Sequence, residues 1–204
     1  DIHRTERIVE YAWVLAQIGK HHPAGGRILD FGYAGSYFAE MLCQFGEVTG
    51  VDPRRTPDIR HPAFRHEWPL TSTGFDTIVC ISVLEHIFCH NSVCHCVRDH
   101  LEGLLKRLAP GGQILITVPS GPPKQFRGYR NIGLMQDIAT WGESTVSLFV
   151  RTSAGWIDGK AQERPPENTQ YEVNAVACVR LTKSYLSERT TEHRHDSIQH
   201  PDHS

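Results

Sequence analysis

Short apolar runs alternate with amphipathic segments along most of the chain. Runs rich in Ile, Val and Leu predict strands, and apolar residues spaced three or four apart predict helices. The run at residues 76–82 is almost continuously apolar, as is typical of a central parallel strand buried on both faces. The predicted strands span residues 27–31, 48–51, 63–66, 76–82, 113–118, 145–151 and 171–182, and the predicted helices span residues 4–19, 36–45, 97–109 and 131–141. This alternation predicts an α/β fold.

Residues 27–52 have the pattern of a βαβ unit built around a nucleotide. Gly32 and Gly35 allow a sharp turn after the first strand, and Asp52 closes the second strand. A carboxylate about 20 residues beyond a glycine turn can accept hydrogen bonds from both ribose hydroxyls of a nucleoside. The pattern therefore indicates a nucleoside ligand.

The turn favours S-adenosylmethionine over a dinucleotide. It lacks the third glycine of G-x-G-x-x-G, which receives a pyrophosphate at a helix N-terminus. Asp30, at the end of the first strand, would repel a phosphate but can bind an amino group. Since S-adenosylmethionine carries an amino group and a sulfonium but no phosphate, a nicotinamide oxidoreductase is strongly disfavoured.

Two later segments complete a set of motifs. They are FDTIVCISVLEHI at residues 75–87 and LLKRLAPGGQILITVPS at residues 104–120, where a helix must stop and reverse at Pro110-Gly111-Gly112. With residues 27–54, they resemble the motifs of class I S-adenosylmethionine-dependent methyltransferases, and the resemblance spans residues 25–183. It implies a three-layer Rossmann-like sandwich whose seven-stranded, mostly parallel sheet has one antiparallel terminal strand.

Ligands of open α/β sheets bind outside the carboxyl ends of the strands, which selects the candidate cofactor residues. These are Asp30, Gly32, Tyr33, Ala34, Gly35, Asp52, Pro53, Glu67, Trp68 and Ser82. We expect Asp52 to bind ribose and, by analogy with the family, Glu67 or the Trp68 ring to meet adenine, although ordinary packing explains Trp68 equally well. The family more often has glycine where this chain has Ala34 and Ser36, but both residues are small. The helix predicted at residues 4–19 would cover the cofactor pocket.

Two candidate catalytic residues follow the fourth predicted strand. Methyl transfer from a sulfonium mainly requires a positioned acceptor and, for a hydroxyl, a base that removes its proton. Glu85 and His86 stand directly after the strand, and an imidazole with its ordinary pKa of about 6.5 suits a base. We therefore name Glu85 and His86 as catalytic candidates, with His86 as the base. Alternatively, both residues cap a helix and orient the cofactor loop.

The candidate acceptor residues lie in later loops. Phe126, Arg127 and Tyr129 follow the fifth predicted strand, and Trp156 stands in a predicted turn between the last two strands. Aromatic and guanidinium groups suit a sugar or an anionic small molecule, although a solvated loop with one anchoring ring is an equal alternative. This loop and the VLEHI segment resemble methyltransferases encoded with polysaccharide or secondary-metabolite pathways. The resemblance implies a hydroxyl of a sugar or other small molecule as acceptor.

A cluster of thiols and imidazoles raises the question of zinc. It comprises Cys89, His90, Cys94, His95, Cys96 and His100. The spacing is not that of a paired zinc knuckle, because structural sites usually match one C-x2-4-C pair to a second pair elsewhere. We therefore predict no metal.

The amino-acid composition limits the classes of binding partner that we expect. Lys and Arg number 21 against 23 acids, so a net charge of -2 gives no basic stripe, and we expect neither nucleic acid nor a membrane as partner. Without an apolar span or a signal-peptide pattern, we expect a cytoplasmic protein with reduced cysteines. We expect one methyltransferase domain at residues 1–183 and a disordered, His-rich tail at residues 184–204. The oligomeric state stays open.

A second function remains possible on these residues. The chain could be a regulatory or interaction protein that binds S-adenosylmethionine but has lost efficient turnover. Ala34, Ser36 and the unusual Cys/His-rich segment motivate this alternative. Cofactor binding without methylation of any acceptor would favour it.

Overall fold

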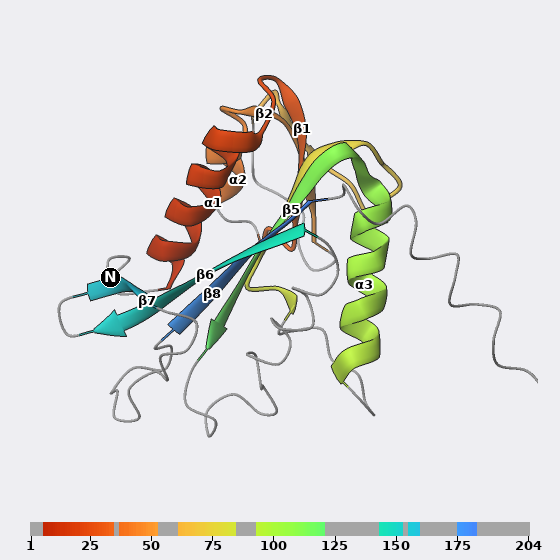
Figure 1. The fold of residues 1–204 in the computed structure, drawn as a ribbon. Helices are drawn as coiled ribbons and strands as arrows, with labels where there is room; N and C mark the ends of the chain where they lie inside the picture. Colours follow the sequence, from red (N-terminus) through yellow and green to blue (C-terminus); the bar gives the residue numbers. More distant parts are fainter. Residues whose placement is uncertain are drawn as a thin grey trace, which may run out of the picture.

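The computed structural model describes residues 6–34, 37–52, 61–84, 93–120, 143–152, 155–159 and 175–182. Its strands form one sheet (Figure 1). They are β1 (Gly26–Phe31), β2 (Gly46–Val51), β3 (Phe64–His66), β4 (Phe75–Ile81), β5 (Leu108–Ser120), β6 (Glu143–Thr152), β7 (Gly155–Gly159) and β8 (Ala175–Thr182). The order across the described sheet is β3-β2-β1-β4-β5-β8-β6-β7.

Five neighbouring strands, from β3 to β5, are parallel. The next strand, β8, is antiparallel to both β5 and β6, and β7 is antiparallel to β6. The predicted mostly parallel sheet with a reversed strand near the C-terminus is confirmed. The strand count is corrected, because the described sheet has eight strands, two of which are reversed.

The additional strand is β7, where we expected a turn. Its sequence, GWIDG, combines turn-forming Gly and Asp with Trp156 and Ile157. Trp156 pairs with Arg151 and Ile157 with Val150 of β6, so the segment joins the sheet as an edge strand. Pairing with β6 therefore outweighs the local turn propensity of this short segment.

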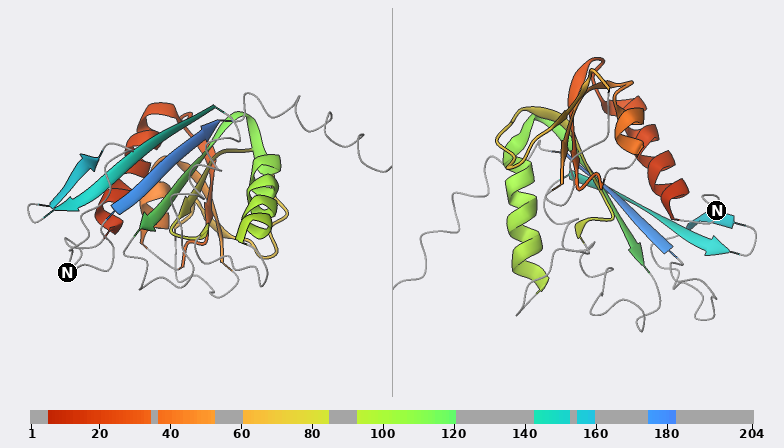
Figure 2. Two further views of the ribbon diagram at one scale, coloured as in Figure 1. Left: turned by 60° about the horizontal axis from the view of Figure 1, so that its bottom comes forward. Right: turned by 180° about the vertical axis from the view of Figure 1, so that it is seen from behind.

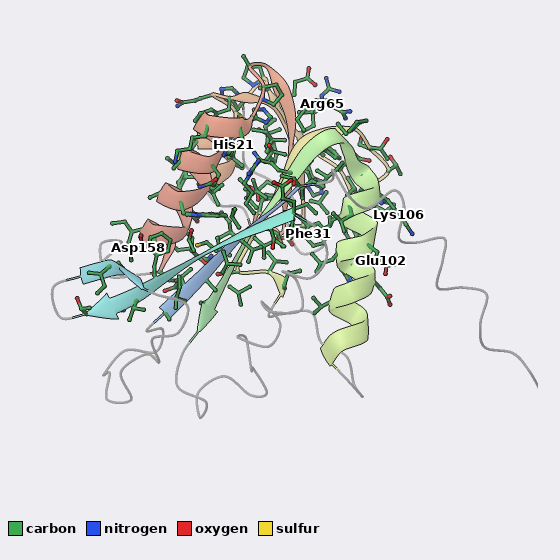
Figure 3. All side chains as sticks on the ribbon, in the orientation of Figure 1. His21, Phe31, Arg65, Glu102, Lys106 and Asp158 are labelled. Atoms are coloured by element: carbon green, nitrogen blue, oxygen red, sulfur yellow. The ribbon has the colours of Figure 1, made fainter. Side chains whose placement is uncertain are left out.

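Helices cover both faces of the sheet, which gives the three-layer arrangement that the motifs implied (Figure 2). The helices α1 (Arg7–His21) and α2 (Phe38–Leu42) lie on one face, and α3 (Val93–Arg107) lies on the other. Ile18 of α1 and Leu42 of α2 share one buried apolar cluster, whereas Leu101 and Leu104 of α3 belong to the second. Figure 3 shows Glu102 and Lys106 on the outer side of α3, where both are exposed.

The predicted helix boundaries shift by a few residues. The helix α1 continues past Gly19 to His21, and the extended backbone of His22 ends it. Pro23 explains this end, since a residue before proline is disfavoured in the α region. The helix α2 is shorter than the predicted 36–45. The helix α3 ends at Arg107, and the Pro110-Gly111-Gly112 turn forms a register irregularity within β5.

Two predicted segments lie outside the described residues. These are the helix at residues 131–141 and the tail at residues 184–204. No helix in the described part of the chain is long and apolar enough to cross a membrane.

Candidate cofactor site

The turn after β1 lies at the point where the strand order reverses, between β1 and β4. Gly32 has a φ of 78°, and its N–H donates a 2.7 Å hydrogen bond to the Val51 carbonyl at the end of β2. A Cβ at position 32 would lie 2.5 Å from Cγ2 of Val83, just after β4. The turn therefore requires glycine here for both its backbone conformation and its close approach to Val83.

Asp52 holds the far side of the same turn. The N–H of Ala34 donates a 3.0 Å hydrogen bond to Oδ2 of Asp52, which is buried at the end of β2. Ala34 has a φ of 52°, a left-handed conformation that costs a non-glycine residue of order 1–3 kcal/mol. The alanine that departs from the family pattern thus adopts the conformation that glycine favours, and the Asp52 carboxylate fixes it.

Asp30 is the second acid of the site, at the end of β1. Its side chain is only 3 % exposed, and burial, reinforced by the nearby charge of Asp52, raises its pKa to about 7. Its Oδ2 has no hydrogen-bond partner among the residues that the structure describes. A buried carboxyl oxygen of this kind favours a ligand that carries a hydrogen-bond donor or a positive charge.

Aromatic side chains line the β2–β3 side of the turn. Tyr33 is buried, and its ring meets that of Phe64 edge to face, with centroids 5.6 Å apart. Its hydroxyl lies 3.3 Å from Nδ1 of His66, the last residue of β3. Gly50 of β2 makes room for this packing, because a Cβ there would lie 2.5 Å from the Phe64 ring. Tyr33 therefore anchors the turn to the edge of the sheet.

Glu67 organises the turn that follows β3. Its Oε1 accepts hydrogen bonds from the Thr71 hydroxyl at 2.6 Å and from the Ser72 N–H at 2.8 Å. Partial burial alone would raise the pKa of Glu67, but the hydrogen bonds from Ser72 and Thr71 outweigh it and lower the pKa to about 2. Trp68 is 57 % exposed. A contact of either residue with adenine stays a prediction.

Ser82 follows β4 and makes a contact that sequence reasoning missed. Its hydroxyl donates a 2.6 Å hydrogen bond to Oε1 of Glu10 on α1. Glu10 is fully buried, although apolar periodicity draws attention only to its neighbours. One signal was present, since Glu10 precedes Trp13 and Val14 by three and four residues and so shares their buried helix face.

Most of the remaining predicted residues lie outside the described part of the chain, and their roles stay predictions. Those outside the described residues are Gly35, Pro53, Glu85, His86, Phe126, Arg127 and Tyr129. Trp156 lies in β7 and packs against the apolar cluster on the α1 side of the sheet. Within the described residues, no three His, Cys, Asp or Glu side chains are grouped to hold a metal ion. Cys89 and His90 lie outside them, as do the side chains of Cys94, His95 and Cys96.

Comparison with solved structures shows the same fold in methyltransferases. N-methyltransferase NodS from Bradyrhizobium japonicum WM9, in complex with S-adenosyl-L-homocysteine, superimposes with a TM-score of 0.56 at 16% sequence identity, over 87% of this chain and 86% of that chain. A putative methyltransferase from Bacillus halodurans C-125 gives a TM-score of 0.52 at 14% identity, over 84% of this chain and 99% of that chain.

The family comparison covers most of the sheet. No curated protein matches the sequence. A family model described as a methyltransferase domain matches residues 3–157, which include the turn after β1, both acids and the residues after β4. The match confirms the resemblance that the motifs carried. The chain belongs to the methyltransferase-domain family, within the class I S-adenosylmethionine-dependent methyltransferases.

Proposed function

We propose that this protein transfers a methyl group from S-adenosylmethionine to a small molecule, most favourably to a hydroxyl of a sugar or secondary metabolite. The observation that carries the proposal is the pair of buried acids on adjacent parallel strands, Asp30 and Asp52, joined by the turn at Gly32 to Ala34. Family membership supports the reaction class.

The residues present suit this cofactor better than a dinucleotide. Oδ2 of Asp30 is buried without a partner among the described residues, which suits an ammonium group. The same carboxyl, beside Asp52, would oppose a pyrophosphate whenever it is ionised. The backbone of Gly32 leaves no room for a side chain on the turn. We therefore assign the amino-acid end of the cofactor to Asp30 and the ribose to Asp52.

S-adenosylmethionine would supply an electrophilic methyl carbon on its sulfonium, from which the neutral thioether of S-adenosylhomocysteine leaves readily. The chain itself contributes position, since a well-oriented acceptor can lower the barrier by roughly 7–11 kcal/mol. Ser82 and Val83 stand at the carboxyl end of β4, beside the cofactor turn. Glu85 and His86 follow Ser82 and Val83 closely in the sequence, and this supports them as candidates to meet the acceptor.

We propose His86 as the base that takes the hydroxyl proton, with Phe126, Arg127 and Tyr129 as acceptor contacts. A positioned base contributes roughly a factor of 10² to 10⁴. Conversion of His86 to Ala should therefore lower kcat by at least about a hundredfold and leave the affinity for S-adenosylhomocysteine unchanged. Unchanged turnover in this variant would remove His86 from the mechanism.

The test is acceptor-dependent formation of S-adenosylhomocysteine from S-adenosylmethionine. The acceptor panel would contain sugars and nucleotide sugars, phenols, and amines, the last because NodS is an N-methyltransferase. Turnover with a hydroxyl acceptor, lost in Asp52→Ala but kept in Arg27→Met at the opposite end of β1, is the expected result. Turnover with amines alone would replace oxygen by nitrogen as the acceptor atom.

The left-handed Ala34 favours one alternative function. A turn that keeps a strained alanine at this position could bind the cofactor less tightly than a glycine turn. The protein would then be an S-adenosylmethionine-binding regulator with weak or no turnover. Binding of S-adenosylhomocysteine together with no methyl transfer to any member of the panel would favour this alternative.

A further inference from the structure

A buried polar cluster joins α1 to the carboxyl ends of two central strands. Glu10 has no exposed surface, yet it is a carboxylate on a helix whose inner face is otherwise apolar. Its Oε1 accepts hydrogen bonds from the hydroxyls of Ser82 at 2.6 Å and Thr117 at 2.8 Å, and its Oε2 accepts one from Arg7 at 2.8 Å. Each carboxylate oxygen is therefore paired, as a buried charge requires.

The cluster sits where β4 ends beside β5. Thr117 of β5 lies opposite Ile81, the last residue of β4, and the Ser82 N–H donates a 3.0 Å hydrogen bond to the Thr117 carbonyl. Burial raises the pKa of Cys178 in β8, and the charge of Glu10 contributes to the same direction. One carboxylate on α1 thus contacts β5 and the residue that follows β4.

The contact continues into the cofactor turn. Ser82 has a φ of 50°, so its hydroxyl bond to Glu10 holds a backbone conformation that serine rarely adopts. The next residue, Val83, lies directly against Gly32, with Cγ2 2.5 Å from where a Cβ would stand. A change in the Ser82 backbone would therefore move the side chain that closes one side of the turn.

We propose that Glu10 is a positioning residue for the cofactor site, acting through Ser82 and Val83 on the turn at Gly32. The inference rests on the proposed function, because it assigns the turn to S-adenosylmethionine. Glu10 does not touch the cofactor in this account. Its carboxylate fixes α1 over the ends of β4 and β5 and fixes the conformation of Ser82, so that the turn is already formed when the ligand arrives.

Two substitutions of Glu10 distinguish the role of its hydrogen bonds to Ser82 and Thr117 from the role of its charge. Glu10→Ala removes the acceptor for both hydroxyls and should weaken S-adenosylhomocysteine binding by at least about tenfold, as expected for the loss of hydrogen bonds to a charged group. Glu10→Gln keeps one carbonyl oxygen, which can still accept both hydroxyls, while Arg7, 38% exposed, can turn to solvent. This variant should stay within about threefold of the wild type, because only the Arg7 bond is lost.

Ile18→Ala provides the matched control. Ile18 is buried on the same helix, two turns closer to its C-terminal end, so its truncation should destabilise the protein without altering the Glu10 cluster. Its affinity for S-adenosylhomocysteine should equal that of the wild type at a temperature where both are folded. An equal loss of affinity in Ile18→Ala and Glu10→Ala would mean that Glu10 acts only through the general stability of the fold, and it would overturn the proposal.

The experiment is calorimetric titration of each full-length variant with S-adenosylhomocysteine. Ser82→Ala is measured as well, in case Glu10→Ala does not fold; it removes one hydroxyl and should weaken binding by about three- to tenfold. Wild-type affinity in Glu10→Ala, or in Ser82→Ala if Glu10→Ala does not fold, would overturn this proposal and leave the proposed function standing. No binding to the wild type would overturn both.

Discussion

Replacement of Asp30 by Asn tests the buried acid of the cofactor site without removing its volume. Asn is neutral at every pH, whereas Asp30 is 3 % exposed and has a pKa raised to about 7 by burial and by Asp52. In the unfolded chain its pKa returns to the ordinary 3.8. Between pH 3.8 and about 7, the folded protein therefore keeps the Asp30 proton whereas the unfolded chain has released it.

The magnitude follows from proton linkage. Below pH 3.8 the Asp30 carboxyl is protonated in both the folded and the unfolded state. Its contribution to the free energy of unfolding is then fully retained. Between pH 3.8 and about 7 the unfolded chain releases the proton while the folded protein keeps it, so the free energy of unfolding falls as pH rises. At about 1.36 kcal/mol per pH unit, the full difference is about 4 kcal/mol, of which about 2.5 kcal/mol falls between pH 5 and pH 8.

Urea unfolding of both proteins at pH 5 and pH 8 measures this effect. We expect the wild type to lose about 2.5 kcal/mol relative to Asp30→Asn over this interval, because the other titrating groups are common to both proteins. A difference between the two proteins that stays constant from pH 5 to pH 8 would refute the raised pKa of Asp30 that its burial causes.

Three further predictions concern the turn and its surroundings. Binding of the S-adenosylhomocysteine ammonium should ionise Asp30, so titrations at pH 6 in buffers of different ionisation enthalpy should show release of about one proton, absent in Asp30→Asn; no release from the wild type would separate Asp30 from the amino group. Gly32 has a φ of 78°, and a Cβ there would lie 2.5 Å from Val83. Gly32→Ala should therefore lower the free energy of unfolding by about 2 kcal/mol and weaken S-adenosylhomocysteine binding at least about tenfold. Normal binding would argue against a rigid turn. Arg27→Met removes a guanidinium 4.9 Å from the centroid of the Phe75 ring and should cost about 1 kcal/mol in urea unfolding with no change in affinity; weakened binding would contradict its place outside the site.

Most strands, as segments of the chain, and the position of both acids at strand ends could be predicted from local sequence. Asp30 and Asp52 each end an apolar run, and parallel strands bring their carboxyl ends to one edge of the sheet. The glycine requirement at position 32 also follows from a strand-to-helix turn. These features depend on neighbours in sequence, which is why apolar pattern and turn chemistry were sufficient.

The Glu10 cluster could not be predicted in this way. Its partners Ser82 and Thr117 are 72 and 107 residues away, and neither distance leaves a periodic trace in the sequence. The strand β7 was missed for a related reason, because Trp156 and Ile157 become a strand only by pairing with β6. Long-range pairing therefore decided the features that local propensity misjudged.

The central claim is that the turn after β1, with Asp30 and Asp52 beside it, binds S-adenosylmethionine. Calorimetric titration with S-adenosylhomocysteine, with NAD in parallel, tests it most directly in the wild type and in Asp52→Ala. We predict micromolar binding of S-adenosylhomocysteine, no binding of NAD, and loss of at least about tenfold in affinity in Asp52→Ala, since a bond to a charged group is removed. Binding of NAD, or S-adenosylhomocysteine affinity unchanged by Asp52→Ala, would contradict the account.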